Sequence, residues 1–278
     1  MTSVRKLLRV FDPAVAHDEG AASSHPGVKD KATARKEIEE LAPRLTELQE
    51  RLYAEGKSGG TRRLVLVLQA IDAGGKDGSV KHVVGQVNPA GVRITSFVGP
   101  TEQERRHDFL WRINHALPPN GYLGVFNRSH YEDVLVVRVH DLVPKDKWEK
   151  RYDAINDWEA ALAGSGTSFV KVFLHISKQE QKARLLARLD DPTKHWKVNP
   201  GDLDERELWP AYCDAYQAVL ARCSTDVNPW YVVPADRKWY RDWALTHLLV
   251  EQLAELDPQW PVRPELDLDG MRRRLKLS

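Results

Sequence analysis

LVLVLQAIDAGGKDGSVK, residues 64–81, joins an apolar run, a glycine-rich turn and a lysine. The run at 64–68 is typical of a buried strand, and 79–87 is predicted to be a helix. Between them the turn at 73–75 leads directly into Lys76. Glycines allow backbone N–H groups to surround an anion, the helix start adds positive charge, and the lysine reaches a phosphate. This layout predicts a phosphate-binding loop, with an ordinary strand–turn–helix as the alternative.

The loop departs from the Walker A pattern G-x-x-x-x-G-K-[ST] in two places and carries an unusual carboxylate at a third. Ala70 stands where the first glycine is expected, and Asp77 replaces the serine or threonine after the lysine. The hydroxyl that usually holds Mg²⁺ is therefore missing. Asp72 places a carboxylate inside the loop, where a phosphate site ordinarily avoids negative charge. We expect Asp72 to hold a cation or to align a second substrate.

Composition limits the class of protein. The chain has 278 residues, enough for one domain of about 250 residues or two small ones. Its 41 lysines and arginines balance 40 acidic residues, so net charge favours neither a nucleic acid nor a membrane as partner. Cys213 and Cys223 lie in one predicted helix, roughly 15 Å apart, too far for a disulfide. Free thiols and the lack of a long apolar stretch predict a soluble cytoplasmic protein.

Strand patterns alternate with helix patterns along the chain, which predicts a mostly parallel α/β sheet with helices on both faces. The predicted strands are 64–68, 92–98, 121–126, 168–176 and 230–233. The main predicted helices are 30–53, 148–163, 178–189, 208–223 and 239–256, with a further helix opened by the capping box of Thr101 and Glu104. Pro43 is expected to kink or split the first of these helices. Segment 1–30 looks loosely structured.

Three strand exits, at 70–76, 127–132 and 235–238, should meet at one edge of this sheet, and all carry phosphate-compatible residues. After the third strand, Asn127 occupies the position at which a carboxylate often holds magnesium. Asp72 or Glu132 could compensate for the missing charge. Arg128 is well placed to hold a phosphate with two hydrogen bonds. His130 could act as a base, but a packed histidine is the better interpretation.

Two further segments carry charge. Arg106, His107 and Arg112 lie on a helix after the second strand, where a solvated face and a ligand-binding face are both reasonable. The polar segment 190–207 suits a mobile lid that closes over anionic substrates, with a plain surface connection as the alternative. We divide the chain into an N-terminal arm and helix (1–55), a phosphotransferase domain (56–260) and a tail (261–278) that packs or assembles.

The chain resembles the polyphosphate kinase 2 family over about residues 35–260. Five blocks in the same order carry the resemblance: QAIDAGGKDGSVKHV at 69–83, PTEQERRHDFLWRI at 100–113, GVFNRSHYEDVLVVRVH at 124–140, KHWKVNPGDLDER at 194–206 and PWYVVPADRKWYR at 229–241. The form NRSHYEDVL, with Asn127, resembles the branch that phosphorylates both nucleoside mono- and diphosphates.

The resemblance implies a thymidylate-kinase-like P-loop fold, a three-layer sandwich with a lid. It also implies Mg²⁺ dependence, with Mn²⁺ as a possible substitute, and inorganic polyphosphate as donor to AMP or ADP. The family's loop lysine corresponds to Lys76, its loop aspartate to Asp72 and its strand-end arginine to Arg128, and these are the expected catalytic residues. Guanine nucleotides and a homo-oligomer are compatible with the sequence.

The remaining site residues are expected around these three. The residues expected to bind phosphate are Ala73, Gly74, Gly75, Asp77, Gly78, Lys81, Arg188, Lys194, Lys197 and Arg237. Those expected to bind the nucleotide are Arg106, His107, Arg112, Asn127 and Glu132, and the expected metal ligands are Asp72 and Glu132. Two other functions fit the same scaffold: an ATP-dependent nucleoside monophosphate kinase and a non-catalytic regulator that binds nucleotide or polyphosphate.

Overall fold

Five segments form the strands of one sheet in the computed structural model, which describes residues 3–278. The strands are β1 (Arg63–Gln69), β2 (Val92–Ser96), β3 (Leu123–Asn127), β4 (Thr167–His175) and β5 (Trp230–Pro234). They pair in the order β2-β3-β1-β4-β5, and each of these pairings is parallel. The predicted parallel sheet is therefore confirmed, with strand ends that move by one or two residues.

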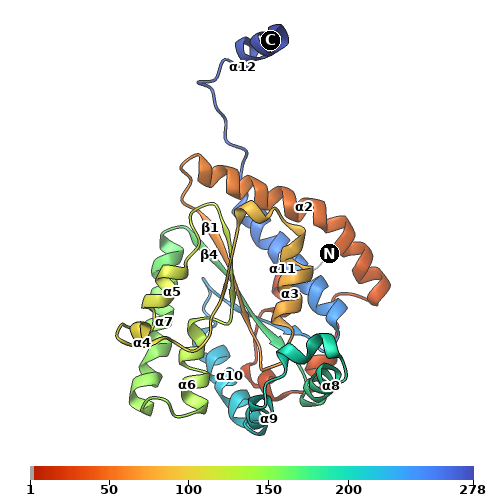
Figure 1. The fold of residues 1–278 in the computed structure, drawn as a ribbon, viewed down its shortest axis with the longest axis vertical. Coiled ribbons are helices and arrows are strands. Elements are labelled where there is room, and N and C mark those ends of the chain that lie inside the picture. The colour runs from red at the N-terminus through yellow and green to blue at the C-terminus, as the bar shows by residue number, and fades with distance from the viewer. Residues whose placement is uncertain (1–2) are drawn as a thin grey trace.

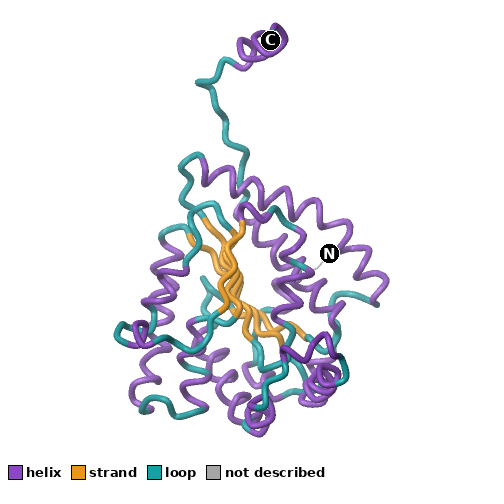
Figure 2. The backbone as a smooth tube through the Cα atoms, viewed as in Figure 1, coloured by secondary structure: helices purple, strands orange, loops and turns teal. Residues whose placement is uncertain are grey.

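Helices cover both faces of the sheet, as the alternating pattern predicts. Figure 1 shows α2, α3 and α11 on one side of the strands and α5 and α7 on the other. The helices are α1 (Val4–Leu8), α2 (Lys31–Lys57), α3 (Lys76–His82), α4 (Glu102–Arg105), α5 (Trp111–Ala116), α6 (Val136–Val139), α7 (Lys145–Gly164), α8 (Lys178–Leu189), α9 (Gly201–Glu207), α10 (Trp209–Cys223), α11 (Lys238–Leu256) and α12 (Leu268–Leu277). Figure 2 shows the twisted sheet enclosed between these layers, which is a three-layer sandwich.

The central strands are buried because both of their faces are covered. From Leu64 to Leu68 every residue of β1 is fully buried, which explains why this stretch reads as an uninterrupted apolar run. Lys171 of β4 is also fully buried, and because its side chain is charged it needs ionic partners. Within residues 3–278, no helix combines the length and the apolar character needed to cross a membrane.

Four local predictions need correction. Helix α2 continues through Pro43 instead of splitting, since its length packs along α11. Helix α3 begins at Lys76, three residues before the predicted start, because Gly75 turns the chain with a φ of +102°. The segment 190–207 is not a plain loop but contains a 3-10 helix, Pro192–Lys197, and α9. The N-terminal segment has ordered turns, and the N–H of Val4 donates to Glu251 of α11.

The tail ends in α12, which lies apart from the rest of the fold at the end of an extended segment (Figure 1). At the opposite end, the C-terminal ends of the parallel strands meet at one edge of the sheet. This edge is where open α/β sheets place their ligands.

Candidate functional site

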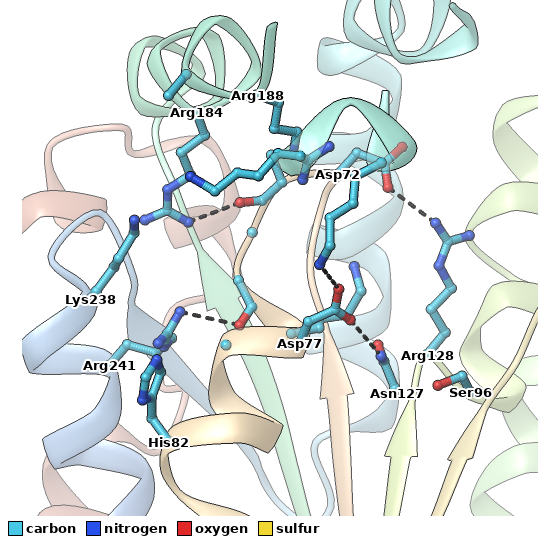
Figure 3. Close-up of a pocket in the computed structure, with 18 of the residues that line it drawn as sticks. Asp72, Asp77, His82, Ser96, Asn127, Arg128, Arg184, Arg188, Lys238 and Arg241 are labelled. Carbon is cyan, nitrogen blue, oxygen red and sulfur yellow. Dashed lines mark hydrogen bonds and ion pairs between the residues drawn. The ribbon is translucent and has the colours of Figure 1, made fainter. Parts of the chain in front are cut away.

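The loop after β1 is held in shape by side chains from two distant helices. Arg184 of α8 donates to the carbonyl oxygen of Ala73 at 2.9 Å, and Arg241 of α11 donates to that of Gly75 at 3.2 Å. Gly75 has a φ of +102°, which strains any other residue, and a Cβ there would displace the Arg241 guanidinium, 2.5 Å away. The first turn of the following helix leaves backbone N–H groups without intrahelical partners. The loop therefore offers N–H donors while its carbonyls are occupied elsewhere (Figure 3).

Lys76 lies at the start of α3, and its Nζ donates to the carbonyl oxygen of Ala70 at 3.0 Å. Burial lowers the pKa of Lys76, and the neighbouring Arg128 lowers it further, while Asp72 and Glu132 act in the opposite direction. The ammonium is thus held within the loop and beside a second cation. A phosphate bound beside these two cations would relieve their mutual repulsion.

A cavity of about 720 Å³ opens above this loop. Eight lysine and arginine side chains and only two carboxylates line it, so an anion is the ligand that its charge favours. Its charged lining residues are Lys76, Arg128, Arg184, Arg188, Lys194, Lys197, Lys238, Arg241, Asp72 and Asp77. Figure 3 shows Arg184 and Arg188 of α8 and Lys238 and Arg241 of α11 on the same side of the loop that carries Asp72 and Asp77. We refer to this cavity as the cationic hollow.

Arg128 sits at the end of β3 in a strained backbone conformation, with a φ of +63°. Its guanidinium lies 3.1 Å from Asp72 and 3.7 Å from Glu132. Although burial opposes it, these two carboxylates raise the pKa of Arg128. For Glu132 the balance differs, because burial raises the pKa of its carboxyl in spite of Arg128. Arg128 therefore keeps its charge between two acidic groups.

A smaller cavity of about 230 Å³ adjoins the first, and Asp72 and Arg128 line both. Its other lining residues include Glu132, Asp202, Glu205 and two tyrosines, Tyr212 and Tyr216 of α10. We refer to it as the acidic hollow. Its acidic and aromatic lining contrasts with the cationic hollow, and it suits the ring and hydroxyl groups of a ligand whose phosphate reaches Arg128.

Asp77 connects three parts of the site. One carboxylate oxygen accepts a hydrogen bond from the Asn127 amide at 3.0 Å, and the other accepts one from Lys197 at 2.9 Å. The Lys197 ammonium, aided by Asn127, holds the pKa of Asp77 below its ordinary value even though burial opposes this. The segment 190–207 is thereby tied to the loop, which supports its interpretation as a lid.

The structure brings most of the predicted site residues together. The cationic hollow includes Asp72, Ala73, Gly74, Gly75, Lys76, Asp77, Gly78, Asn127, Arg128, Arg188, Lys194 and Lys197. Glu132 lines the acidic hollow, where Arg128 lies between its carboxylate and that of Asp72. One guanidinium thus contacts both of the carboxylates that were predicted as metal ligands. Among residues 3–278, no group of three His, Cys, Asp or Glu side chains is arranged to hold a metal ion.

Five predicted residues lie outside both hollows. Lys81 and Arg237 point to solvent, and His82 and Lys238, one residue further on, line the cationic hollow instead. Arg106 is exposed, and the exposed His107 stacks on Trp111. The half-buried Arg112 donates to the carbonyl oxygen of Val98 at 2.7 Å, so it supports the wall of the hollow rather than contacting a ligand.

Sequence reasoning missed Arg184, Lys238 and Arg241 as site residues. Arg184 precedes Arg188 by four residues on α8, so both lie on one helix face, and Lys238 and Arg241 stand three apart on α11. That helical spacing was the available signal.

His130 is packed, as predicted, and belongs to a buried ionic network beneath the site. Glu159 of α7 contacts Lys171 at 2.6 Å and His130 at 3.1 Å, and it accepts a hydrogen bond from the Tyr131 hydroxyl at 2.8 Å. Burial lowers the pKa of His130, which therefore stays neutral near pH 7. The network anchors the turn that follows Arg128 to both α7 and β4.

The chain is similar to known proteins over most of its length. A family profile described as Polyphosphate kinase 2 matches residues 28–261. An AMP/ADP-polyphosphate phosphotransferase of Meiothermus ruber is 52% identical over 84% of this chain and 86% of its own. An ADP-polyphosphate phosphotransferase of Rhodopseudomonas palustris is 44% identical over 78% of each. The crystal structure of Polyphosphate Kinase 2 from Arthrobacter aurescens TC1 superimposes with a TM-score of 0.92 at 46% identity, covering 100% of this chain and 98% of that one.

Proposed function

This chain belongs to the polyphosphate kinase 2 family, and we propose that it transfers the terminal phosphate of inorganic polyphosphate to AMP or ADP. One observation carries the proposal. A cationic hollow and an acidic, aromatic hollow adjoin at Asp72 and Arg128, beside the loop lysine Lys76. A site of this form accommodates two phosphate-bearing molecules from different directions, so that their phosphates meet between the two hollows.

The cationic hollow takes the polyphosphate chain in this proposal. Polyphosphate carries a negative charge on each unit and lacks a base or sugar, so it needs a row of cations rather than an aromatic pocket. Lys238, Arg241 and Lys194 supply part of that row from two different elements of the fold. The terminal phosphate lies at Lys76, within reach of the loop N–H groups.

The acidic hollow takes the acceptor nucleotide. Tyr212 and Tyr216 offer ring faces and hydroxyls, and the carboxylates of Asp202 and Glu132 can accept hydrogen bonds from ribose hydroxyls or amino groups of a base. Both adenine and guanine carry an amino group, so guanine nucleotides are included in the proposal. The acceptor's own phosphate is held by Arg128.

Transfer requires two anions to approach in line, so charge repulsion and positioning dominate the barrier. Lys76 and Arg128 counter the charge on the phosphate that moves, and Asp72 fixes the orientation of Arg128 through their 3.1 Å contact. The lid, which carries Lys197, closes over the hollow beside Arg188. It excludes water that would otherwise hydrolyse the polyphosphate. No covalent intermediate on the protein is needed.

We also assign Mg²⁺ as the metal, with Mn²⁺ as its substitute. The available donors are carboxylate and amide oxygens, which are hard ligands, and Mg²⁺ in such sites takes one or two carboxylates together with substrate phosphates. Asp72 and Asp77, which both line the cationic hollow, fit this requirement. When bound, the ion would neutralise phosphate charge during transfer.

Location and assembly follow as further parts of the proposal. Cys213 and Cys223 are free and buried, which fits the reducing cytoplasm where nucleotides are found. Helix α12 exposes Met271, Leu275 and Leu277 away from the rest of the fold, which supports contact with a second copy of the chain.

The test is a donor comparison. The purified protein is incubated with AMP, GMP, ADP or GDP and either polyphosphate or ATP, with Mg²⁺, and the nucleotide products are separated over time. We expect di- and triphosphates from polyphosphate. Lys76→Ala should abolish transfer with an unchanged circular dichroism spectrum. Products that form from ATP and AMP but not from polyphosphate would indicate a conventional nucleoside monophosphate kinase, and tight binding without transfer would indicate a regulator.

A further inference from the structure

One wall of the cationic hollow carries no charge. It is formed by residues 96–99, at the end of β2 and just beyond it, and these residues line this hollow but not the acidic one. Because β2 is an edge strand, it pairs with β3 on one side only. A backbone bond of 3.0 Å, from the N–H of Phe97 to the carbonyl oxygen of Asn127, ends this pairing. Val98, the next residue, is supported by a side chain instead.

Arg112 of α5 supplies that support. Its Nη1 donates to the carbonyl oxygen of Val98 at 2.7 Å, and its guanidinium lies over the Phe97 ring, 5.6 Å from the ring centroid. Its Nη2 lies 3.7 Å from Oδ2 of Asp133. Within residues 3–278 this Oδ2 is buried and accepts no hydrogen bond, so the nearby guanidinium helps to compensate its charge. One arginine thus joins the Asp133 carboxylate to the wall.

Asp133 is itself held in place from α7. Arg151 donates to its carbonyl oxygen at 3.0 Å and to its Oδ1 at 3.1 Å. The preceding residue, Glu132, lines the acidic hollow and lies 3.7 Å from Arg128. Asp133 therefore connects the turn beside the acidic hollow with the wall of the cationic hollow.

We propose that Asp133 is a positioning residue for the phosphate chain: through Arg112 it fixes the wall at 96–99 and so the width of the cationic hollow. This role rests on the proposed function only in that a phosphate chain enters that hollow. It concerns the affinity for the chain, and no step of the transfer passes through Asp133. It also explains why the sequence blocks at 100–113 and 124–140 each carry a charged residue that lies outside both hollows.

Charge alone predicts the opposite effect of the key substitution. Asp133→Asn keeps the shape of the side chain but removes a negative charge near a hollow that favours anions. A general electrostatic effect would therefore tighten the binding of polyphosphate. Loss of positioning would weaken it, because a neutral amide no longer holds the guanidinium against the wall. The sign of the change separates the two explanations.

The first experiment measures the dissociation constant of linear polyphosphate of one defined length by calorimetry, with the full chain and without nucleotide. Asp133→Asn should weaken binding roughly 3- to 10-fold. Arg112→Lys keeps the charge but loses the planar guanidinium that spans both contacts, and it should weaken binding by a similar factor. Because the two residues act as one unit, the double variant should bind no more weakly than the weaker single variant.

Arg151→Met is the matched control. It removes the other guanidinium that contacts Asp133, and its own contacts are with Asp133 and the Phe109 ring rather than with the wall. If Asp133 only stabilised the fold, this variant would reproduce the effect of Asp133→Asn. We expect a lower melting temperature but a dissociation constant for polyphosphate within about twofold of the wild type.

Kinetics separate positioning of the chain from a part in transfer. With AMP as acceptor, Asp133→Asn should raise the KM for polyphosphate, while kcat and the KM for AMP stay within about twofold of the wild type. The reason is that the wall at 96–99 lines the cationic hollow alone. If Asp133→Asn does not fold, Asp133→Glu replaces it, since it keeps the charge but displaces it by one methylene group, and it should also raise this KM.

Several results would overturn the positioning role. They are unchanged or tighter polyphosphate binding by Asp133→Asn, or by Asp133→Glu where that variant takes its place, and effects of the Asp133 and Arg112 variants that multiply as if independent. An Arg151→Met effect on polyphosphate affinity as large as that of the Asp133 variant would also overturn it, as would a loss confined to kcat.

These results are distinct from those of the donor comparison. If polyphosphate supports transfer but its affinity ignores Asp133, the positioning role fails and the proposed function stands. If the affinity follows Asp133 but no nucleotide is phosphorylated, the positioning role stands and the proposed function fails. A wild type that binds no polyphosphate would overturn both.

Discussion

Replacing Lys171 with methionine should destabilise the whole protein, although the residue does not touch the proposed substrates. Lys171 is fully buried in β4, and its ammonium donates to Glu159, to the Tyr131 hydroxyl at 3.0 Å and to the carbonyl oxygen of Cys223 at 2.7 Å. Methionine fills a similar volume, so the main change is the loss of the charge. Glu159, 1% exposed, is left as a buried carboxylate without its cation.

The size of the effect follows from the 2.6 Å contact between Lys171 and Glu159. At an effective dielectric constant near 20, the attraction over that distance is about 6 kcal/mol, and the desolvation of both ions offsets part of it. Loss of one partner from such a pair costs about 3–5 kcal/mol in the free energy of unfolding. For a chain of this length we expect the melting temperature to fall by roughly 5–15 °C.

The loss of stability in Lys171→Met should depend on pH. In the wild type, burial opposes ionisation, but Lys171 and His130 hold the pKa of Glu159 below its ordinary value. The stabilisation from this shift is present at neutral pH and is lost as the pH falls through the lowered pKa. In Lys171→Met, burial without the cation raises the pKa instead. The penalty is then full at neutral pH and disappears as the pH falls below the ordinary glutamate value of about 4.3.

The assay is urea unfolding of wild type and variant from pH 7 down to pH 4.5, with the double variant Lys171→Met/Glu159→Met as the control. The double variant should be more stable than the single one at pH 7, because it removes the unpaired charge along with its partner. A single variant that loses less than about 1 kcal/mol at pH 7, or whose loss grows toward pH 4.5, would refute the reasoning.

Three further predictions concern the site. Asp72→Asn should lower kcat about 100-fold without changing the melting temperature by more than about 2 °C, because it releases Arg128 but no core contact; parallel kinetics and thermal unfolding check this. Lys238→Ala should raise the KM for polyphosphate several-fold, whereas Lys81→Ala, outside the hollow, should not, as initial rates against polyphosphate concentration will show. Arg184→Lys keeps the charge but loses the planar guanidinium that donates to the loop carbonyl, so kcat should fall about 10-fold with little change in KM. An equal rise in KM would contradict a positioning role.

The local chemistry of the chain determined most of the fold. Four of the strands, β1, β3, β4 and β5, are apolar runs whose two faces are both covered, so their boundaries could be predicted to within two residues from hydrophobicity. The edge strand β2 is largely exposed, and its alternation of apolar and polar residues was the signal there. The loop before Lys76 could also be predicted from the sequence, because the φ of +102° at Gly75 favours glycine. The predicted break at Pro43 was wrong. Helix propensity counts the hydrogen bond that proline removes, but it does not include the packing of α2 along α11, which keeps the helix continuous.

The partners of the site residues were decided only by the tertiary structure. The local sequence pattern predicts that a lysine or an aspartate lies on a turn. It does not predict which distant segment lies beside that turn, because this depends on the order of the strands in the sheet. Thus Asp77 contacts Asn127 and Lys197, and Arg241 reaches the loop while Arg237 faces solvent. Arg128 pairs with both carboxylates that were predicted as metal ligands. Backbone periodicity depends on neighbours three or four residues away, whereas charge pairing depends on distances of a few ångströms in space, and only the folded chain sets those distances.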